Sequence, residues 1–357
     1  MSNLALDIQG NENINQMIKE IKDKITKSPI SDLVDDSENQ YVDLVLQGGG
    51  VLGIALVGYT YALEQAGLRF LNIAGTSAGA INALFLAALG KPNSSKSIEL
   101  LEIFNGMDMK SFIDGGLIAE ALVDDIKNKD NFITAILPKL GILAAECKFS
   151  KNKLGVNPGK TFEEWLKNEL KKRGITTNEQ LLQNLVNPQD LRIRNRPECS
   201  LNQKDIEDDL KESKLAIVAA DVTTQTKVIF PQMADLYWDN YKEVSPCKFV
   251  RASMSIPLFF EPLVIDKIPK GKESDWDQKA GYKGDIPSSV YFVDGGIVSN
   301  FPIDIFHQKN RVPLCPTFGV KLHADRNEIQ NIDNIKDFLV ALFDRLCCIK
   351  PLTAEFS

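Results

Sequence analysis

Histidine is scarce in this sequence, which contains only His307 and His323 among 357 residues. Cysteine is sparse as well, and none of its six residues forms a C-x-x-C pair: Cys147, Cys199, Cys247, Cys315, Cys347 and Cys348. With so few nitrogen and sulfur ligands, the sequence argues against a zinc site. The cysteines fit reduced thiols in a cytosolic setting better than a disulfide framework. We therefore expect a protein without a metal and without a cofactor.

Basic residues are fewer than acidic residues in this sequence. Lysine and arginine together number 41 against 48 acidic residues, which gives a formal net charge of −7. This balance argues against bulk electrostatic attraction to nucleic acid or to an anionic membrane surface. Any peripheral membrane contact therefore has to depend on a local apolar patch.

The sequence shows neither a secretory signal nor a membrane span. Its start has no basic region followed by an apolar core. The uncharged stretch 73–90 is nearly long enough to cross a bilayer, but glycine, threonine, serine and asparagine interrupt it and no basic flank orients it. A buried strand, turn and helix explain it better. We expect a cytoplasmic protein with peripheral membrane contact, and nothing in the sequence indicates an oligomeric state.

Length and composition are those of a globular protein with a large core. Hydrophobic residues make up 44% of the chain and charged residues 25%. We divide the chain into an N-terminal amphipathic helix and linker (1–40), a main domain (41–325) and a C-terminal helical segment (326–357). The apolar residues of the N-terminal helix recur at helical spacing, which favours a helix that covers the core over one that contacts lipid or a partner.

Apolar periodicity and turn residues predict the remaining elements. Strands are expected at 41–46, 70–74, 215–219, 227–230, 290–293 and 318–322. Helices are expected at 14–25, 53–66, 80–89, 97–104, 117–126, 132–146, 161–172, 178–185 and 249–255, and one more after residue 302. Residues 267–284 are expected to form a loop. Alternating strands and helices predict an α/β fold.

The pentapeptide 75–79 reads Gly-Thr-Ser-Ala-Gly and lies between a strand-like run and a buried helix. G-x-S-x-G in this context is a nucleophile elbow, which exposes a serine at a sharp turn from strand to helix. Side chains at Gly75 and Gly79 would collide with the neighbouring strand or helix. The turn also places the oxygen of Ser77 at a helix N-terminus, where amide groups favour negative charge.

A glycine-rich loop at 48–53 precedes the elbow by one strand. Gly48, Gly50 and Gly53 formally match the dinucleotide fingerprint G-x-G-x-x-G, but the acidic residue expected at the end of the next strand is missing. A P-loop is excluded because no Gly-Lys-Ser/Thr follows. The remaining interpretation is an oxyanion hole, in which the amides of Gly48, Gly49 and Gly50 face an oxygen that becomes negative during acyl transfer.

A serine needs a base to act as a nucleophile near neutral pH. Asp294 follows a predicted strand and precedes Gly295 and Gly296, and the strand ends of open α/β sheets are where active sites gather. Asp294 followed by His307 or His323 would fit the order of a Ser-His-Asp triad. Neither histidine lies in a glycine-rich loop at a strand end, so Asp294 is the better-placed residue.

The ordered blocks 48–53, 75–79, 252–262 and 294–302 resemble those of the patatin-like phospholipases, over about residues 41 to 322. The resemblance implies a three-layer α/β/α sandwich with a central, mostly parallel sheet. It also implies calcium-independent lipid acyl hydrolysis by a Ser-Asp dyad without histidine. It assigns Ser77 as nucleophile and Asp294 as base, with an oxyanion hole at Gly48–Gly50. The implied substrate is a phospholipid or another acyl lipid.

Two features depart from the family pattern or duplicate it. Many members carry a basic residue where this chain has Leu52, so any help from such a cation to the oxyanion or to a lipid phosphate is absent. A second Asp-Gly-Gly begins at Asp114, but it lies between predicted helices and lacks the strand and the Asn-x-Pro that follow Asp294. Two alternatives stay open: a triad esterase, and a catalytically silent lipid- or nucleotide-binding module on the same fold.

Overall fold

The computed structural model describes residues 4–50, 53–115, 154–194, 211–307, 312–322 and 332–333. The helices in this part of the chain are α1 (Leu4–Gly10), α2 (Glu12–Lys27), α3 (Gly53–Gln65), α4 (Ala78–Ala88), α5 (Ser97–Asn105), the 3-10 helix η2 (Met109–Phe112), α8 (Lys160–Lys172), α9 (Asn178–Asn184), α11 (Ala234–Tyr237), α12 (Cys247–Ser253), α13 (Glu273–Ala280) and α14 (Gly296–Ser299). The strands are β1 (Leu33–Val34), β2 (Gln40–Leu46), β3 (Leu68–Thr76), β4 (Gly155–Asn157), β5 (Arg192–Ile193), β6 (Leu215–Asp221), β7 (Thr226–Phe230), β8 (Leu258–Phe260), β9 (Leu263–Asp266), β10 (Ser289–Asp294) and β11 (Thr317–Val320).

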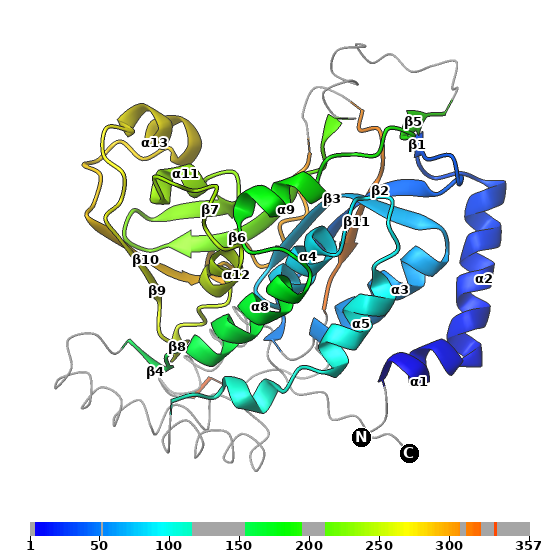
Figure 1. The fold of residues 1–357 in the computed structure, drawn as a ribbon, viewed down its shortest axis with the longest axis horizontal. Coiled ribbons are helices and arrows are strands. Elements are labelled where there is room, and N and C mark those ends of the chain that lie inside the picture. The colour runs from blue at the N-terminus through cyan, green and yellow to red at the C-terminus, as the bar shows by residue number, and fades with distance from the viewer. Residues whose placement is uncertain are drawn as a thin grey trace.

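Nine of these strands form one mixed sheet (Figure 1). Its main path runs β5-β1-β2-β3-β6-β10-β9, while β11 pairs with β2 and β7 pairs with β6. The central strands β11, β2, β3 and β6 are mutually parallel, and antiparallel pairs flank them. Parallel strands need crossover connections, which the intervening helices supply. The predicted α/β fold with a mostly parallel central sheet is confirmed.

The sheet is covered on both faces. Along β2, Val42, Leu44 and Leu46 belong to the large core cluster that includes residues of α3, α4, α5 and α8, which Figure 1 shows on one face of the sheet. Val45 points the other way and belongs to a smaller cluster beside Phe301 and neighbouring residues. A strand buried on both faces reads as a continuous apolar run, which is how β2 appears in the sequence.

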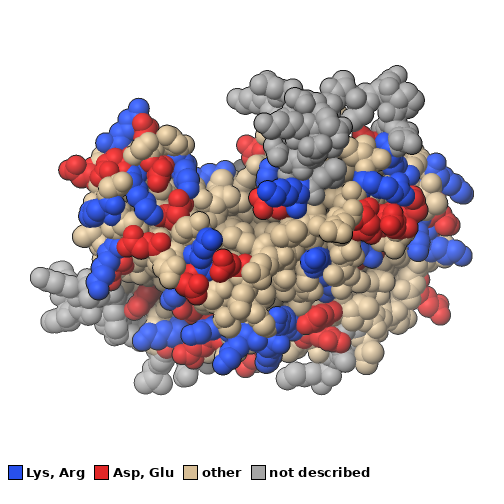
Figure 2. Space-filling view, turned by 45° about the horizontal axis from the view of Figure 1, so that its top comes forward, with Lys and Arg blue, Asp and Glu red and all other residues tan. Residues whose placement is uncertain are grey.

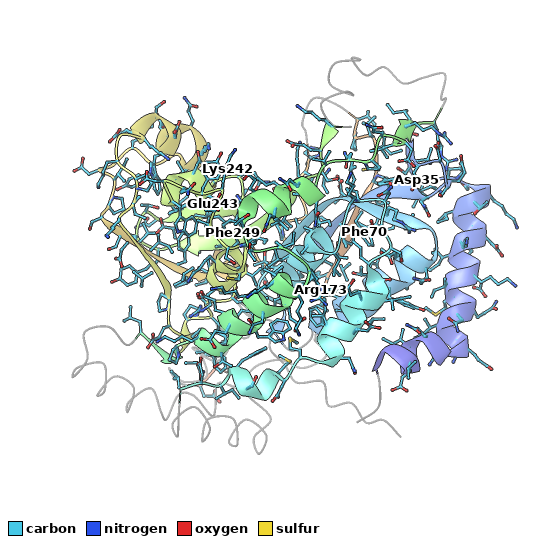
Figure 3. The ribbon with its side chains drawn as sticks, in the orientation of Figure 1. Asp35, Phe70, Arg173, Lys242, Glu243 and Phe249 are labelled. Carbon is cyan, nitrogen blue, oxygen red and sulfur yellow. The ribbon has the colours of Figure 1, made fainter. Side chains whose placement is uncertain are left out.

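Helix α4 lies at the centre of the face of the sheet that the large core cluster covers. All of its residues are buried, and it packs on β2, β3 and β6. Nearby, Phe249 of α12 stacks on Phe230 of β7 with ring centroids 4.8 Å apart; Phe249 is labelled in Figure 3. The amphipathic helix α2 covers the core as predicted, because Ile14, Ile18 and Ile25 pack against the large cluster.

Three local predictions are wrong, the first two because tertiary contacts outweigh composition. The stretch 32–40, the linker part of the predicted N-terminal segment, is not a plain linker, because β1 pairs with β2 and β5. Buried Asp35, which Figure 3 labels, accepts hydrogen bonds from the amides of Ser37 and Asn39 in the turn between β1 and β2. The polar stretch 267–284 contains α13, which is anchored by buried Trp276 against Tyr237.

The third error concerns the segment after residue 302, where a helix is expected. Residues 303–306 form turns instead. The amide of Ile305 donates a hydrogen bond to the carbonyl of Pro302, and the amide of His307 donates one to the carbonyl of Asp304. These bonds span three residues rather than four, so the chain turns without continuing as an α-helix.

Several expectations lie outside the described residues. They concern the helices at 117–126 and 132–146, the segment 326–357 apart from residues 332–333, and the residues Leu52, His323, Cys147, Cys199, Cys347 and Cys348. The two cysteines within the described part, Cys247 and Cys315, are free thiols. Among the described helices, none has both the length and the apolar character needed to cross a bilayer. Figure 2 shows basic and acidic side chains interspersed on the face in view, without an extended basic surface.

Candidate active site

The turn that the sequence predicts as a nucleophile elbow lies between β3 and α4. Ser77 follows the last residue of β3 and precedes α4, with φ of 53° and ψ of −122°. A serine rarely adopts this backbone conformation, so the surrounding packing must hold it there. A Cβ on Gly75 would lie 2.2 Å from the carbonyl oxygen of Gly79, and one on Gly79 would lie 2.3 Å from that of Leu46. Both glycines are therefore required by space.

Strand β6 brings the aspartate to the serine. One edge of β6 pairs with β7, and the other pairs first with β3 and then with β10. Thr76, at the end of β3, pairs with Val218, and Asp294, at the end of β10, pairs with Ala219. Because β3 runs parallel to β6 and β10 antiparallel, the two strands meet end to end. Ser77 and Asp294 therefore lie next to each other along the same edge of β6.

The serine and the aspartate are in direct contact. Ser77 Oγ donates a hydrogen bond to Asp294 Oδ2 at 2.7 Å, and the amide of Gly296 donates to Asp294 Oδ1 at 2.7 Å. Burial raises the pKa of Asp294 from 3.8 to about 6, although these two hydrogen bonds act to lower it. The carboxylate is therefore a stronger base than an exposed aspartate and still ionised at neutral pH.

Sequence reasoning assigned no role to residues 253 and 254, which also contact the serine. The hydroxyl of Ser253 accepts the amide hydrogen of Ser77 at 2.9 Å, and the Sδ atom of Met254 lies 3.4 Å from Ser77 Oγ. The only signal was that these residues belong to a block shared with the family. Their role depends on the position of α12, which the sequence alone does not reveal.

The glycine loop lies beside the elbow, and one of its three expected oxyanion donors is engaged. The amide of Gly48 donates to the backbone carbonyl of Asn300 at 3.0 Å, and Asn300 Nδ2 donates back to the carbonyl of Gly48 at 3.3 Å. Gly48 therefore links the loop to the segment after α14. The oxyanion proposal consequently rests on the amides of Gly49 and Gly50.

Alanine at Gly48 is expected to be more damaging than alanine at Gly49. A Cβ on Gly48 would lie 2.2 Å from Asn300 Oδ1 and 3.0 Å from the Cβ of Ser77, so it would press directly on the Ser77 side chain. A Cβ on Gly49 would meet mainly the end of the Leu322 side chain, at 2.4 Å, and that end can move.

We expect Gly48→Ala to lower kcat about 10²-fold, as for a misplaced catalytic group, and Gly49→Ala to lower it less than about tenfold. Ester hydrolysis by the two purified variants measures this difference. The reverse order would mean that the space around Gly49 matters more than the contact between Gly48 and Ser77.

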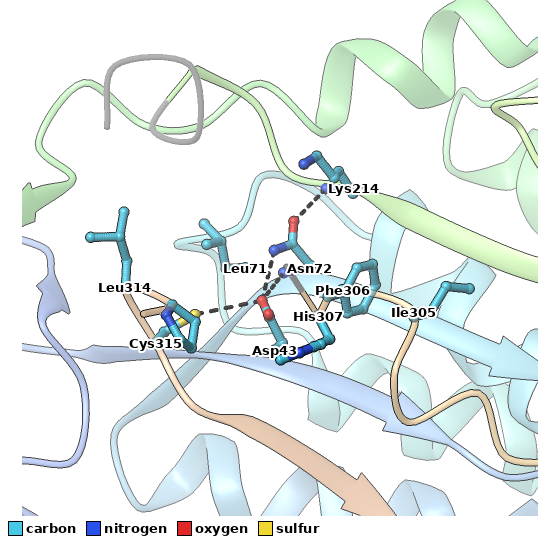
Figure 4. Close-up of a pocket in the computed structure, with 10 residues that line it drawn as sticks. Asp43, Leu71, Asn72, Lys214, Ile305, Phe306, His307, Leu314 and Cys315 are labelled. Carbon is cyan, nitrogen blue, oxygen red and sulfur yellow. Dashed lines mark hydrogen bonds between the residues drawn. The ribbon is translucent and has the colours of Figure 1, made fainter. Parts of the chain in front are cut away.

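His307 lines a pocket that contains neither Ser77 nor Asp294. A cavity of about 130 Å³ has His307, Asp43, Asn72 and Cys315 in its lining (Figure 4). In this pocket Asp43 accepts hydrogen bonds from Asn72 and Cys315. Asn72 precedes Ser77 by five residues along β3, a distance of roughly 16 Å at the rise of a β-strand. The direct hydrogen bond between Ser77 and Asp294 also leaves no place for a histidine between them.

The second Asp-Gly-Gly has a structural role. The carboxylate of Asp114 accepts hydrogen bonds from the amides of Gly159 and Thr161, both at 3.0 Å, at the start of α8. A carboxylate in this position satisfies helix donors that otherwise lack partners and complements the helix dipole. Asp114 is thus a helix cap.

Comparison with known proteins agrees with this geometry. The model of the family described as patatin-like phospholipase matches residues 44–307, which include the glycine loop, the elbow and Asp294. The chain belongs to the patatin-like phospholipase family. A protein of Bacillus subtilis (strain 168), named uncharacterized protein YqhO, is 30% identical over 309 residues, which cover 86% of this chain and 80% of that protein.

Membership of the patatin-like phospholipase family makes lipid acyl hydrolysis the activity expected at family level, and a lipid the expected substrate. Among the described residues, no group of three or more histidine, cysteine, aspartate or glutamate side chains is arranged to hold a metal ion. The groups that meet at the described site are the Ser77 hydroxyl, the Asp294 carboxylate and backbone amides.

Proposed function

We propose that this protein is a phospholipase A-type serine acyl hydrolase that uses Ser77 and Asp294 as a catalytic dyad. The observation that carries the proposal is the 2.7 Å hydrogen bond from Ser77 Oγ to a buried carboxylate whose pKa is raised to about 6. A nucleophile in contact with a base of raised pKa is the arrangement that acyl transfer requires.

In the proposed reaction, Ser77 Oγ attacks the ester carbonyl carbon while its proton passes to Asp294 Oδ2. The carbonyl oxygen becomes negative, and the amides of Gly49 and Gly50 donate hydrogen bonds to it. Collapse of the tetrahedral intermediate expels the alcohol, which takes the proton from Asp294. Water then attacks the acyl-enzyme with Asp294 again acting as base, and this step releases the fatty acid and restores Ser77.

Calcium independence is part of the proposal, because the nucleophile is a serine and needs no metal-activated water. Incubation of the protein with a membrane lipid extract, followed by mass spectrometry, tests the whole proposal. We expect free fatty acids and lysophospholipids to accumulate with the native protein, with or without EDTA, and not with Ser77→Ala.

A silent binding module is the alternative from another class. A fluorophosphonate probe separates it from the enzyme, because only an activated serine displaces the fluoride and becomes covalently labelled. Labelling at Ser77 together with product formation supports the hydrolase, whereas lipid binding without labelling supports the module.

We also propose that peripheral membrane contact occurs through aliphatic side chains next to the dyad. Ile297 and Val298 follow Asp294 closely on α14 and are 41% and 43% exposed, and Ile54 at the start of α3 is 39% exposed. They lie on the helices that directly follow Asp294 and the glycine-rich loop. The negative net charge leaves apolar contact as the source of attraction to lipid.

The double variant Ile297→Asp, Val298→Asp is expected to bind phosphatidylcholine vesicles about tenfold more weakly, because aliphatic burial is lost and charge is added. Sedimentation with vesicles measures this. Ile98→Asp is the matched control, since Ile98 is 42% exposed but lies on α5. Equal vesicle binding by the two variants would show that α14 does not contact the lipid.

A further inference from the structure

We propose that Ser253 is a positioning residue that holds the strained nucleophile and the loop of the base in one unit. This inference rests on the proposed function of Ser77 and Asp294. Ser253 is the last residue of α12 and is fully buried, with 0% of its surface exposed. It contacts the backbone on both sides of the dyad, and its side chain points to the nucleophile.

The first contact fixes the elbow. Ser77 lies at φ of 53°, and its amide hydrogen bonds the hydroxyl oxygen of Ser253 at 2.9 Å. The single hydroxyl hydrogen of Ser253 goes to the carbonyl of Val218 at 2.6 Å. A hydroxyl has one donor and two acceptor lone pairs. Because its hydrogen is committed to β6, an oxygen lone pair of Ser253 is left to accept the amide of Ser77.

The second contact reaches the base. The carbonyl of Ser253 accepts the amide of Gly295 at 3.3 Å, and two residues later the carbonyl of Ser255 accepts the amide of Asp294 at 2.8 Å. Gly295 is also pressed against β6, where a Cβ would lie 2.1 Å from the carbonyl oxygen of Val218. Ser253, at the end of α12, and Ser255, just after it, therefore hydrogen-bond the backbone amides of Ser77 and Asp294.

Buried Arg251 keeps this end of α12 in place. Its guanidinium donates to Ser255 Oγ at 2.6 Å, to the carbonyl of Pro158 at 2.9 Å and to the carbonyl of Glu261 at 2.8 Å. Three acceptors from three segments hold the planar group in one orientation. The hydroxyl of Ser253 thus reaches the elbow from a rigid support, which is what precise placement of a nucleophile needs.

Two variants of Ser253 and one matched control test the proposal. Ser253→Ala removes the acceptor, and Ser253→Cys keeps a similar shape while replacing oxygen by a weak acceptor. Ser213→Ala is the control, because Ser213 is also buried and donates a 2.6 Å hydrogen bond, but to Asn187 and not to the dyad. Ser77→Ala serves as the inactive reference.

We expect both Ser253 variants to lower kcat and the rate of fluorophosphonate labelling about 10- to 10²-fold, with KM within about twofold. Ser213→Ala should keep kcat within about twofold, even where thermal unfolding shows a similar loss of stability. If either Ser253 variant folds and is labelled at the native rate, Ser253 does not position the nucleophile. If Ser77→Ala retains activity, the proposed dyad itself fails, so the two failures are distinguishable.

Discussion

Replacement of Ser77 by alanine is expected to lower turnover by ~10⁴-fold or more, as for other enzymes that lose a nucleophile. The change removes only the hydroxyl that contacts Asp294, and the backbone hydrogen bond from residue 77 to Ser253 is independent of the side chain. The variant should therefore fold and bind lipid. Release of fatty acid, measured beside circular dichroism, checks both statements, and retention of most activity would overturn the assignment of Ser77.

A glycine at the same position separates chemistry from backbone strain. Residue 77 has φ of 53° and ψ of −122°, a conformation that glycine adopts readily and that other residues adopt at a cost of roughly 1–3 kcal/mol. We expect Ser77→Gly to be as inactive as Ser77→Ala but more stable to unfolding by about 1 kcal/mol. Equal stability of the two variants would mean that residue 77 stores no strain.

Asp294→Asn is expected to abolish turnover nearly as completely, because the nucleophile and the base of the proposed dyad act as a unit. The amide can still accept the hydrogen bond from Gly296 and donate to Ser77 Oγ, so the shape of the site is kept. In the native protein, activity should fall as the pH drops through about 6, where Asp294 becomes protonated. The kcat/KM profile of the native enzyme measures that acid limb.

The same substitution should stabilise the fold at neutral pH. Burial raises the pKa of Asp294 from 3.8 in the unfolded chain to about 6, so the folded state binds more protons between these values and its stability falls as the pH rises. The loss of stability caused by the buried carboxylate is absent below pH 3.8 and complete above about pH 6. Its size is on the order of 3 kcal/mol.

We therefore expect the unfolding free energy of Asp294→Asn, relative to that of the native protein, to increase between pH 4 and pH 7. Urea unfolding at several pH values measures this difference, from which other titrating groups such as Asp43 cancel. A difference that does not change with pH would mean that the carboxylate is better solvated than its burial implies.

The double variant His307→Gln, His323→Gln is the control for the base. It should keep activity within a few-fold, because Asp294 contacts Ser77 directly and His307 lies in the pocket of Asp43. Asp114→Asn is a second control, and any change should appear in stability, since Asp114 caps α8. Collapse of activity in a folded histidine variant would restore the triad alternative.

The sequence by itself determined the α/β fold class and the turn at 75–79, and it singled out Ser77 and Asp294, which the structure brings into hydrogen-bond contact. These depend on contiguous residues: Gly75 and Gly79 have no space for side chains, and an apolar strand and helix flank them. A turn of this kind is encoded locally, so five residues and their neighbours are sufficient to recognise it. The two Asp-Gly-Gly motifs can be told apart for the same reason, because only the one that begins at Asp294 comes directly after a predicted strand.

Tertiary structure alone decided how these parts meet. Ser77 and Asp294 are 217 residues apart, and they touch because β3 and β10 end against each other on one edge of β6. The engagement of the Gly48 amide by Asn300 and the contact of Ser253 with the elbow likewise join distant segments. Strand pairing and burial select such contacts from many that the sequence pattern permits, because their energy depends on the partner across the fold and not on sequence neighbours.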